Sequence, residues 1–381
     1  MGVFMEFRIE RKNFLKGLAM VQTIVERRST IPILSNVLLQ VDEKGITLTA
    51  TDLETAIRGN FPASMVVEGQ VSVPARKLFE IIRELPETEI HFTKKENNWV
   101  TLTCQKSVFN MAGINPEEFP PLPKFREEDF HPFPIQELRQ MIERTVFAAS
   151  TEESRYNLNG VFFKGLHIEN QPSVRMVATD GHRLSLMDKV GLEFSSLEQG
   201  VIVPKKGLLE IRRLIGDGGQ KDEEEGDLVY LSLSENNLVA KRDGLIVLTR
   251  LIEGEFPDYE SVIPAENDKK VTLSKDHFIA CLKRVSTMAT EKGEGLLFQV
   301  QRGSMAVSSS SQDFGDAKEE IDIEYGGEDL SVGFNGRYLL DALATMESEE
   351  VLFELKDSAT AGVLRPVGEE GHLCLVMPMK L

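Results

Sequence analysis

The stretch VPARKLFEIIRELP at residues 73–86 points to the fold, because a matching stretch, VPKKGLLEIRRLIG, stands at residues 203–216. A third stretch, FNGRYLLDALATME, stands at residues 334–347, so the three begin 130 and 131 residues apart. In each stretch apolar residues recur at spacings of three, four and seven, which places them on one face of a helix. Chance agreement of three amphipathic helices is the alternative for these stretches alone, and a threefold repeat is the stronger hypothesis.

Other segments support a repeat that covers about a third of the 381-residue chain. A helix-like segment opens each third: IERKNFLKGLAMVQTIV, PIQELRQMIERTVFAAS and SKDHFIACLKRVSTMAT. Strand-like runs follow each segment, and the tripeptide ATD recurs at 50–52 and 178–180. Alternating residues in ITLTA, VYLSLS and VTLTC predict antiparallel sheets with one covered face. We expect six helices, at residues 8–28, 76–83, 134–155, 203–213, 274–292 and 334–350.

The order of helix, strands, helix and strands in each unit predicts an α+β fold of three similar domains. Proline-rich stretches at 116–134 and 254–264 are the candidate linkers. The sequence FNMAGINPEEFPPLP before the first boundary resembles VLTRLIEGEFPDYESVIP before the second. The acidic run Asp222–Glu225 is most simply a solvated loop. We expect domains at 1–127, 128–256 and 257–381.

The cysteine pattern indicates a reducing compartment. Cys104, Cys281 and Cys374 are odd in number, widely spaced and outside any CxxC motif, which argues against a disulfide framework and a cysteine zinc site. The chain has no 18-residue apolar run, and its start lacks the apolar core of a signal peptide. We therefore expect a cytoplasmic protein with no membrane partner.

The net charge of −18 argues, taken alone, against a simple nucleic-acid binder. The charge is unevenly distributed, however. The predicted helices 8–28, 76–83, 203–213 and 274–292 carry a net charge of +11, and the rest of the chain carries −29. A positive face can hold DNA inside an acidic whole, because phosphate attraction is local and screened by salt. The alternative is that lysine and arginine are good helix formers and lie on helices for that reason.

Aromatic residues are scarce on these segments, and Trp99 is the only tryptophan. Platforms for stacking the bases of a single strand are therefore not indicated. Contacts to DNA would go to the duplex backbone and would carry no sequence information.

The sequence gives no positive sign of catalysis. None of the six histidines forms an HxxxH or HExxH motif, so a helical zinc site is not predicted, and we expect neither metal nor cofactor. Asp180-Gly181-His182-Arg183 is a possible acid/base cluster, but a GxSxG nucleophile motif is missing. The glycines at 216–219 lack the Lys-Ser/Thr of a phosphate loop and lead into acidic residues. We expect a protein that is not an enzyme.

Seven segments resemble the bacterial DNA polymerase III β subunit, the sliding-clamp family, along essentially the whole chain. They are TIPILSNVLL, VPARKLFEIIRELP, SRYNLNGVFF, VATDGHRL, VIVPKKGLLEI, EFPDYESVIP and VMPMKL. The combination of VATDGHRL with the VMPMKL ending is specific to the family. The resemblance implies three similar domains per chain, with helices lining a ring and antiparallel sheets outside. It also implies that two chains join head to tail and encircle duplex DNA as a processivity factor.

The resemblance further implies a hydrophobic pocket for partner peptides. Its residues are Leu158, Thr179, Gly181, His182, Arg183, Leu184, Pro257, Val262, Leu375, Val376, Met377, Pro378, Met379 and Leu381. Methionines are adaptable, which suits a pocket that accepts several peptides, and Gly181 would allow a close backbone approach. An apolar terminus usually frays unless it is docked. Read from the residues alone, a C-terminal strand that closes a core is the more common arrangement, and the resemblance reverses that order.

Contacts to DNA are implied for basic residues and one tyrosine: Arg28, Arg76, Lys77, Arg83, Tyr156, Lys205, Lys206, Arg212 and Arg213. Contacts between the two chains are implied for Phe109 and Met111 in the first domain and for Thr287 and Met288 in the third, with simple core burial as the alternative for the first pair. The chain departs from the family pattern at Asn157, where a second aromatic residue is common. It departs again at Gly293-Glu294, where a bulky residue usually precedes a basic one.

The implied partners are double-stranded DNA, bound without sequence preference, the polymerase III catalytic subunit and a second copy of the chain. A clamp-loading ATPase complex and other proteins with a clamp-binding motif are implied as well. Two hypotheses from other classes stay open on the residues alone. One is an acidic repeat scaffold that binds protein peptides without DNA, and the other is a hydrolase that uses Asp180 and His182.

Overall fold

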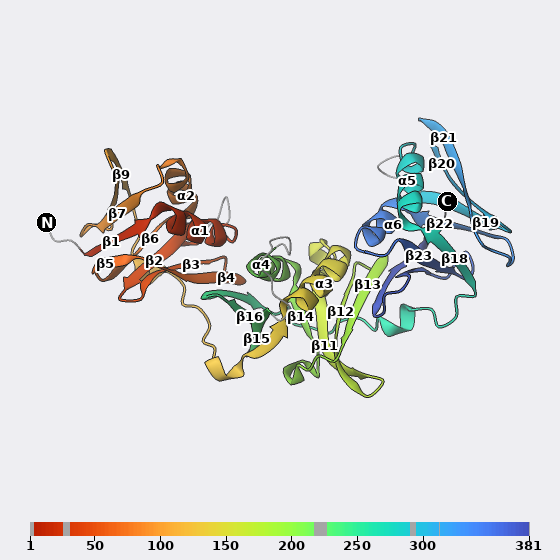
Figure 1. Ribbon diagram of the computed structural model, residues 1–381, viewed down its shortest axis with the longest axis horizontal. Helices are drawn as coiled ribbons and strands as arrows, with labels where there is room; N and C mark the ends of the chain where they lie inside the picture. Colours follow the sequence, from red (N-terminus) through yellow and green to blue (C-terminus); the bar gives the residue numbers. More distant parts are fainter. Residues whose placement is uncertain (1–3, 26–30, 217–226, 290–294, 312, 381) are drawn as a thin grey trace. The chain divides into compact units, whose positions relative to one another are not determined.

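The computed structural model describes residues 4–25, 31–216, 227–289, 295–311 and 313–380 (Figure 1). The chain forms two compact units. The first consists of Met1–Ile135 and Leu209–Leu251, and the second of Gln136–Leu208 and Ile252–Leu381. Each unit contains one eight-stranded and one five-stranded sheet, and every strand pair in them is antiparallel.

In the first unit the five-stranded sheet has the order β5-β1-β7-β8-β9. Its strands are β1 (Met5–Glu10), β5 (Ser64–Val67), β7 (Glu89–Lys94), β8 (Val100–Cys104) and β9 (Ser107–Met111). The eight-stranded sheet has the order β10-β15-β16-β17-β4-β3-β2-β6. Its strands are β2 (Asn36–Asp42), β3 (Gly45–Thr51), β4 (Thr55–Phe61), β6 (Gly69–Pro74), β10 (His131–Pro134), β15 (Leu228–Ser234), β16 (Asn237–Arg242) and β17 (Leu245–Arg250).

In the second unit the eight-stranded sheet has the order β14-β11-β12-β13-β25-β24-β23-β18. Its strands are β11 (Gly160–Ile168), β12 (Gln171–Thr179), β13 (Arg183–Val190), β14 (Val201–Pro204), β18 (Lys269–Ser274), β23 (Glu350–Leu355), β24 (Gly362–Pro366) and β25 (His372–Val376). The five-stranded sheet has the order β21-β20-β19-β22-β26. Its strands are β19 (Gly295–Gln301), β20 (Ser304–Ser311), β21 (Gly315–Asp322), β22 (Leu330–Asn335) and β26 (Pro378–Met379).

In the described residues, six α-helices occupy the six predicted positions, with shorter bounds at four of them. They are α1 (Arg11–Val21), α2 (Ala75–Glu84), α3 (Ile135–Thr145), α4 (Lys205–Ile215), α5 (Lys275–Ser286) and α6 (Gly336–Leu343). The predicted start of the first helix is wrong, because residues before Arg11 belong to β1. The cause is the alternation of Met5, Phe7 and Ile9, which are buried, with outward side chains. A strand thus precedes the helix in each third of the chain, where β1, β10 and β18 stand.

None of the described helices is long and apolar enough to cross a lipid bilayer.

Helix α1 packs closely on β3 and β4. A Cβ atom added at Gly17 would lie 2.7 Å from Leu48 Cδ1 and 2.8 Å from Phe61 Cε2. Leu48 and Phe61 therefore point toward the helices. Because side chains alternate across a sheet, Thr49 and Arg58 lie on its opposite face.

The two eight-stranded sheets each join strands from two different thirds of the chain. In the first unit β4 pairs with β17, and in the second unit β13 pairs with β25. We call these two antiparallel joints the β4–β17 seam and the β13–β25 seam. Compact units that follow the sheets do not coincide with domains that follow the repeat, so the boundaries at 1–127, 128–256 and 257–381 stay a prediction.

The ATD repeat builds the same turn beside each seam. Thr51 Oγ1 donates to Thr55 O at 3.0 Å, and Thr179 Oγ1 donates to Arg183 O at 2.6 Å. In each turn the aspartate that follows the threonine accepts two backbone N–H groups, at 2.6–2.9 Å for Asp52 and 2.9–3.0 Å for Asp180. The two ATD segments therefore share a backbone structure as well as a sequence.

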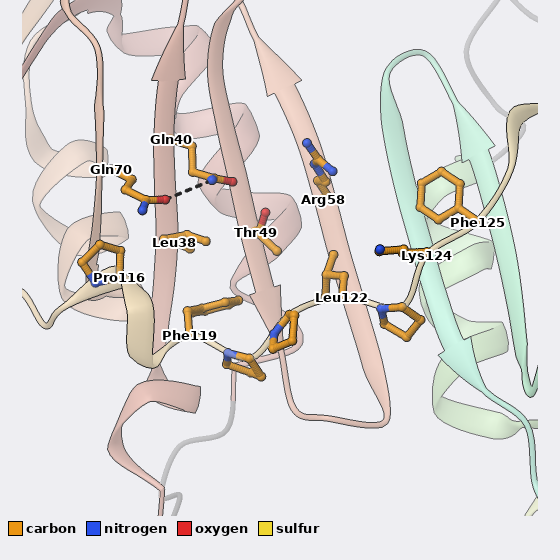
Figure 2. Close-up of a pocket in the computed structure, with 13 residues that line it drawn as sticks. Leu38, Gln40, Thr49, Arg58, Gln70, Pro116, Phe119, Leu122, Lys124 and Phe125 are labelled. Carbon is orange, nitrogen blue, oxygen red and sulfur yellow. Dashed lines mark hydrogen bonds between the residues drawn. The ribbon is translucent and has the colours of Figure 1, made fainter.

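Strand β3 differs from the expected pattern of one covered face. All seven of its residues are buried. The proline-rich segment 116–125 passes over the face that does not meet the helices, as Figure 2 shows. Part of the predicted linker is itself ordered structure, with 3-10 turns at Pro116–Glu118 and Glu127–Asp129 before β10.

Candidate functional site

Many of the residues implied for partner binding lie together in the second unit, on one face of the eight-stranded sheet. Leu184 and Leu375 face each other across the β13–β25 seam, and both are buried. They belong to an apolar cluster with Val177, Leu186, Tyr259, Ala361, Val363 and Leu373, against which Phe162, Phe256 and Ile263 pack. Phe162 and Phe256 stack with ring centroids 5.1 Å apart. The cluster supplies an apolar floor.

Exposed side chains from three segments are grouped by this fold. We call them the docking surface: Gly181 and His182 of the turn, Pro257 and Val262 of the 254–264 segment, and Met377 and Met379 of the C-terminus. The N–H of Met377 donates to the carbonyl oxygen of His182 at 2.8 Å, which joins the C-terminal segment to the turn. Val262, Met377 and Met379 expose 47%, 38% and 37% of their surface. Apolar side chains of this exposure can accept an apolar partner residue.

Gly181 is required by the geometry of the turn. Its φ of +87° lies in the left-handed region, which side chains disfavour. A Cβ atom there would also lie 2.8 Å from Arg155 Nη1, and this guanidinium donates to the carbonyl oxygen of Asp180 at 3.1 Å. Arg155 is not among the predicted site residues, although it lies in the segment SRYNLNGVFF.

The C-terminus combines the two arrangements considered from the sequence. Strand β25 is buried at all five positions, including Leu375 and Val376, and so it closes a core. After Met377 the chain pairs with the other sheet of the unit, where Pro378 lies opposite Phe334 and Met379 opposite Gly333. The terminal segment thus bridges two sheets while Met377 and Met379 stay partly exposed. Leu381 lies outside the described residues.

Arg183 points away from the docking surface, toward the helices. Its Nε donates to Asp180 Oδ2 at 3.0 Å and its Nη1 to Asp341 Oδ2, on helix α6, at 2.6 Å. Its Nη2 donates to the carbonyl oxygen of Phe147 at 3.1 Å. The guanidinium carbon lies 4.5 Å from the ring centroid of Tyr338 and 5.4 Å from that of Phe147. The side chain therefore fastens the turn to α6, while its backbone completes the turn.

This network also bears on the hydrolase hypothesis. Both carboxylate oxygens of Asp180 accept hydrogen bonds, Oδ1 from two backbone N–H groups and Oδ2 from Arg183. A carboxylate held in this way is a structural element of the turn. In the part of the chain that the structure describes, no group of three or more His, Cys, Asp or Glu side chains is placed to hold a metal ion.

Asn157, a departure from the family pattern, has a structural role. Its Nδ2 donates to the carbonyl oxygen of Glu255 at 3.1 Å and so ties the 153–158 turn to the 254–264 segment. The neighbouring Leu158 is buried, whereas Tyr156 is exposed. A Cβ atom at Gly254 would come within 3.4 Å of the Tyr156 hydroxyl. The amide therefore orders this segment without a second aromatic ring.

The residues implied for DNA lie on α2, on α4 and in the turn that holds Tyr156. Those on α2 are exposed: Arg76 donates to the carbonyl oxygen of Val25 at 3.2 Å, and Lys77 pairs with Glu80 at 2.5 Å. The hydrogen bond and charge of Lys77 lower the pKa of Glu80. Arg83 pairs with Glu84 at 3.1 Å. Such exposed pairs are weak and can exchange for phosphate oxygens.

On α4 the cations differ in exposure. Arg213 is exposed and pairs with Glu210, while Arg212 is partly buried and donates to the carbonyl oxygen of Gly216. Burial lowers the pKa of Lys205, and the nearby Arg183 charge lowers it further. Lys206 is exposed. The stretch that holds Arg28 lies outside the described residues.

The residues implied for the joint between chains lie on or beside the end strands of two sheets. Phe109 is 36% exposed on β9, the last strand of its sheet, whereas Met111 is largely buried. Thr287 and Met288 follow α5, and Met288 Cε lies 3.5 Å from a Cβ atom built at Gly315 on the edge strand β21. The alternative of core burial therefore does not hold for Phe109, which is exposed, but it does hold for Met111. Gly293-Glu294 lies outside the described residues.

The Arg183 network generates a prediction about stability. We expect Arg183→Met to lower the free energy of unfolding by about 2–3 kcal/mol, because it removes three charge-assisted hydrogen bonds at a largely buried position. Arg155→Met is the matched control. Arg155 is exposed, so its loss should cost less than about 1 kcal/mol. Chemical denaturation of both variants measures the difference, and equal losses would contradict the role given to Arg183.

Comparison with known proteins agrees with this architecture over the whole chain. Models of the DNA polymerase III beta subunit match the N-terminal domain at residues 5–123, the central domain at 133–258 and the C-terminal domain at 260–380. The beta sliding clamps of Caulobacter vibrioides and Pseudomonas putida are each 34% identical, and each alignment covers 99% of this chain and 100% of the relative.

Solved structures are similar over the same length. The DnaN sliding clamp from Bartonella birtlesii bound to griselimycin has a TM-score of 0.93 at 31% identity, over 99% of this chain and 100% of that one. The beta sliding clamp of C. crescentus has a TM-score of 0.92 at 33% identity, over the full length of both chains. The chain therefore belongs to the DNA polymerase III beta subunit family of sliding clamps.

Proposed function

We propose that two copies of this chain join head to tail into a ring that encircles duplex DNA and holds the replicative polymerase on it. The chain is then a processivity factor and has no catalytic role of its own. The domain boundaries 1–127, 128–256 and 257–381 are part of this proposal, as is a location in the bacterial cytoplasm, where replication takes place.

The observation that carries the ring is the pattern of the two seams. Each seam joins two sets of three consecutive antiparallel strands. The third strand of one set pairs with the third strand of the other: β4 of β2-β3-β4 with β17 of β15-β16-β17, and β13 of β11-β12-β13 with β25 of β23-β24-β25. Two more strands hold the same place in their sets, β21 after β19 and β20, and β9 after β7 and β8. Both lie at sheet edges, and in the described part of the chain neither has a partner on its outer side. Pairing β21 with β9 of the second copy extends the pattern to a third seam.

Such a joint is heterologous, and it closes because two chains supply six repeats. Phe109 on β9 and the neighbours of β21, Thr287 and Met288, then lie at the contact. An exposed edge strand with apolar side chains is otherwise an aggregation hazard, and pairing removes it. The exposed Val108 and Phe109 are consistent with a strand that is covered in the assembly.

For DNA, we propose that the cations of α2 and α4 face the duplex. Each is a phosphate contact without sequence information, and the existing pairs with Glu80, Glu84 and Glu210 keep the grip weak enough for sliding. The acidic remainder of the chain repels DNA from other faces.

For protein partners, we propose that the docking surface takes an extended peptide of the polymerase III catalytic subunit, of the clamp loader and of other proteins with a clamp-binding motif. Tethering acts through effective concentration, because a weakly held polymerase rebinds before it diffuses away. The sequence has no nucleotide-binding loop of its own, so ring opening is assigned to a separate ATPase.

Retention on DNA tests the encircling role. After loading onto nicked circular DNA, the protein should stay bound through gel filtration in high salt, because a closed ring is held by topology. Linearising the same DNA should release it, because the ring slides off the ends. Equal release from circular and linear DNA would contradict the proposal.

A second prediction concerns the docking surface. Val262→Asp places a charge on it and should weaken binding of the polymerase catalytic subunit at least about tenfold, since a central apolar contact is lost. Val190→Asp is the matched control, because Val190 is similarly exposed, at 51% against 47%, and lies outside the docking surface. Surface plasmon resonance compares the two. Unchanged binding by Val262→Asp, or equal weakening by both, would show that the docking surface is misassigned.

A further inference from the structure

A hollow of about 540 Å³ lies beside the β4–β17 seam in the first unit (Figure 2). We call it the seam hollow. One side is the proline-rich segment, and the floor is the sheet face that turns away from the helices. It is lined by Leu38, Gln40, Thr49, Arg58, Gln70, Pro116 and residues 119–125. None of these residues belongs to the docking surface.

The seam hollow stands where the docking surface stands on the other seam. Ala56 lies opposite Leu248, and Leu184, 128 residues after Ala56, lies opposite Leu375. Beside these pairs, Thr49 lies opposite Arg58 in the register in which Val177 lies opposite Leu186. The corresponding turns carry the same hydrogen bonds, as described above. The two sites are therefore copies of one backbone arrangement.

The copies differ in the chemistry of the floor. Where the apolar cluster beside the docking surface has Val177 and Leu186, the seam hollow has Thr49 and Arg58. Leu122 and Phe125 of the proline-rich segment already cover the apolar pair Ala56 and Leu248. The apolar residues that an apolar peptide would contact are thus already covered at the seam hollow. What remains open beside them is more polar.

Two cations at the seam hollow have no carboxylate partner. Arg58 and Lys124 are both exposed, and neither forms an ion pair with any described residue. Other exposed cations, such as Lys77, Arg83 and Arg213, each pair with a carboxylate. Two unpaired cations in one hollow provide charge complementarity for an anionic ligand.

The remaining polar groups suit a peptide backbone. Gln40 Nε2 donates to Gln70 Oε1 at 3.1 Å, which leaves Gln40 Oε1 as an acceptor and Gln70 Nε2 as a donor. Leu38, Phe119 and Leu122 add apolar surface. The prolines of the segment lack N–H groups and hold an extended chain, beside which another extended chain can lie.

We propose that the seam hollow is a second docking site, which binds an extended acidic peptide segment of a partner protein. The peptide places carboxylates at Arg58 and Lys124 and an apolar side chain against the proline-rich segment. The two seams of one chain then select different peptides, apolar at the β13–β25 seam and acidic at the β4–β17 seam. This inference rests on the duplicated geometry and not on use of the docking surface.

The test uses the full-length protein with Val262→Asp, which keeps the docking surface from contributing. The probe is the fluorescein-labelled peptide Gly-Glu-Leu-Glu-Pro-Gly, and its glutamine counterpart, Gly-Gln-Leu-Gln-Pro-Gly, is the neutral control. Fluorescence anisotropy should show saturable binding of the acidic peptide that weakens with added NaCl. Arg58→Leu and Lys124→Ser should each weaken that binding about fivefold.

Arg126→Ser is the matched control, because Arg126 is an exposed cation that directly follows the proline-rich segment and does not line the hollow. It should leave binding within about twofold. Equal affinity for the acidic and neutral peptides, no saturable binding, or no effect of Arg58→Leu and Lys124→Ser would overturn the proposal. If Arg58→Leu or Lys124→Ser fails to fold, the NaCl titration of peptide binding by the Val262→Asp protein tests the proposal. Failure here would leave the ring unaffected, because DNA retention is measured separately.

Discussion

The structure depends on one constraint, the antiparallel pairing of β4 with β17 and of β13 with β25. Backbone N–H and C=O groups at a sheet edge must find partners or be exposed. In this chain β4 and β17 satisfy each other, as do β13 and β25, so each eight-stranded sheet runs from one repeat into the next. The strands that hold the same place in the other two sets, β9 and β21, lie at sheet edges, and the proposed ring pairs them with a second copy.

Each seam also sets what can be built beside it. The turn after β3 and the turn after β12 are held by the same threonine and aspartate hydrogen bonds, and Leu53 adopts the left-handed φ of +79° where Gly181 adopts +87°. Because the two turns share one backbone geometry, the side chains determine how the two seams differ in chemistry. Leu186 gives one seam an apolar floor, and Arg58 gives the other a cation.

The sequence predicted much of the fold because its signals are local. The helix predicted at 76–83 lies at Ala75–Glu84, and the ATD repeat reappears as two equivalent turns. The first helix was predicted three residues too early, because Arg8, Ile9 and Glu10 fit either a helix or a strand until β1 pairs with β7. Burial of β3 on both faces depends on a segment about 70 residues away in the chain, which periodicity does not report.

The candidate site was less accessible to sequence reasoning. Its residues came from family resemblance, and the resemblance did not give the direction of a side chain. Arg183 is joined to Asp341, 158 residues later, and so faces α6 instead of the docking surface. Asn157 acts through the backbone of Glu255, 98 residues later. Contacts over such separations carry no local pattern, and only the folded chain reveals them.

The most direct measurement of the central claim is the mass of the protein in solution, because a ring requires two chains. One chain has a mass of 42.7 kDa, so a head-to-tail dimer closed by two β9–β21 seams has a mass of about 85 kDa. Light scattering coupled to gel filtration at micromolar concentration should give that value. A mass near that of a single chain, unchanged as the concentration is raised, would contradict the ring.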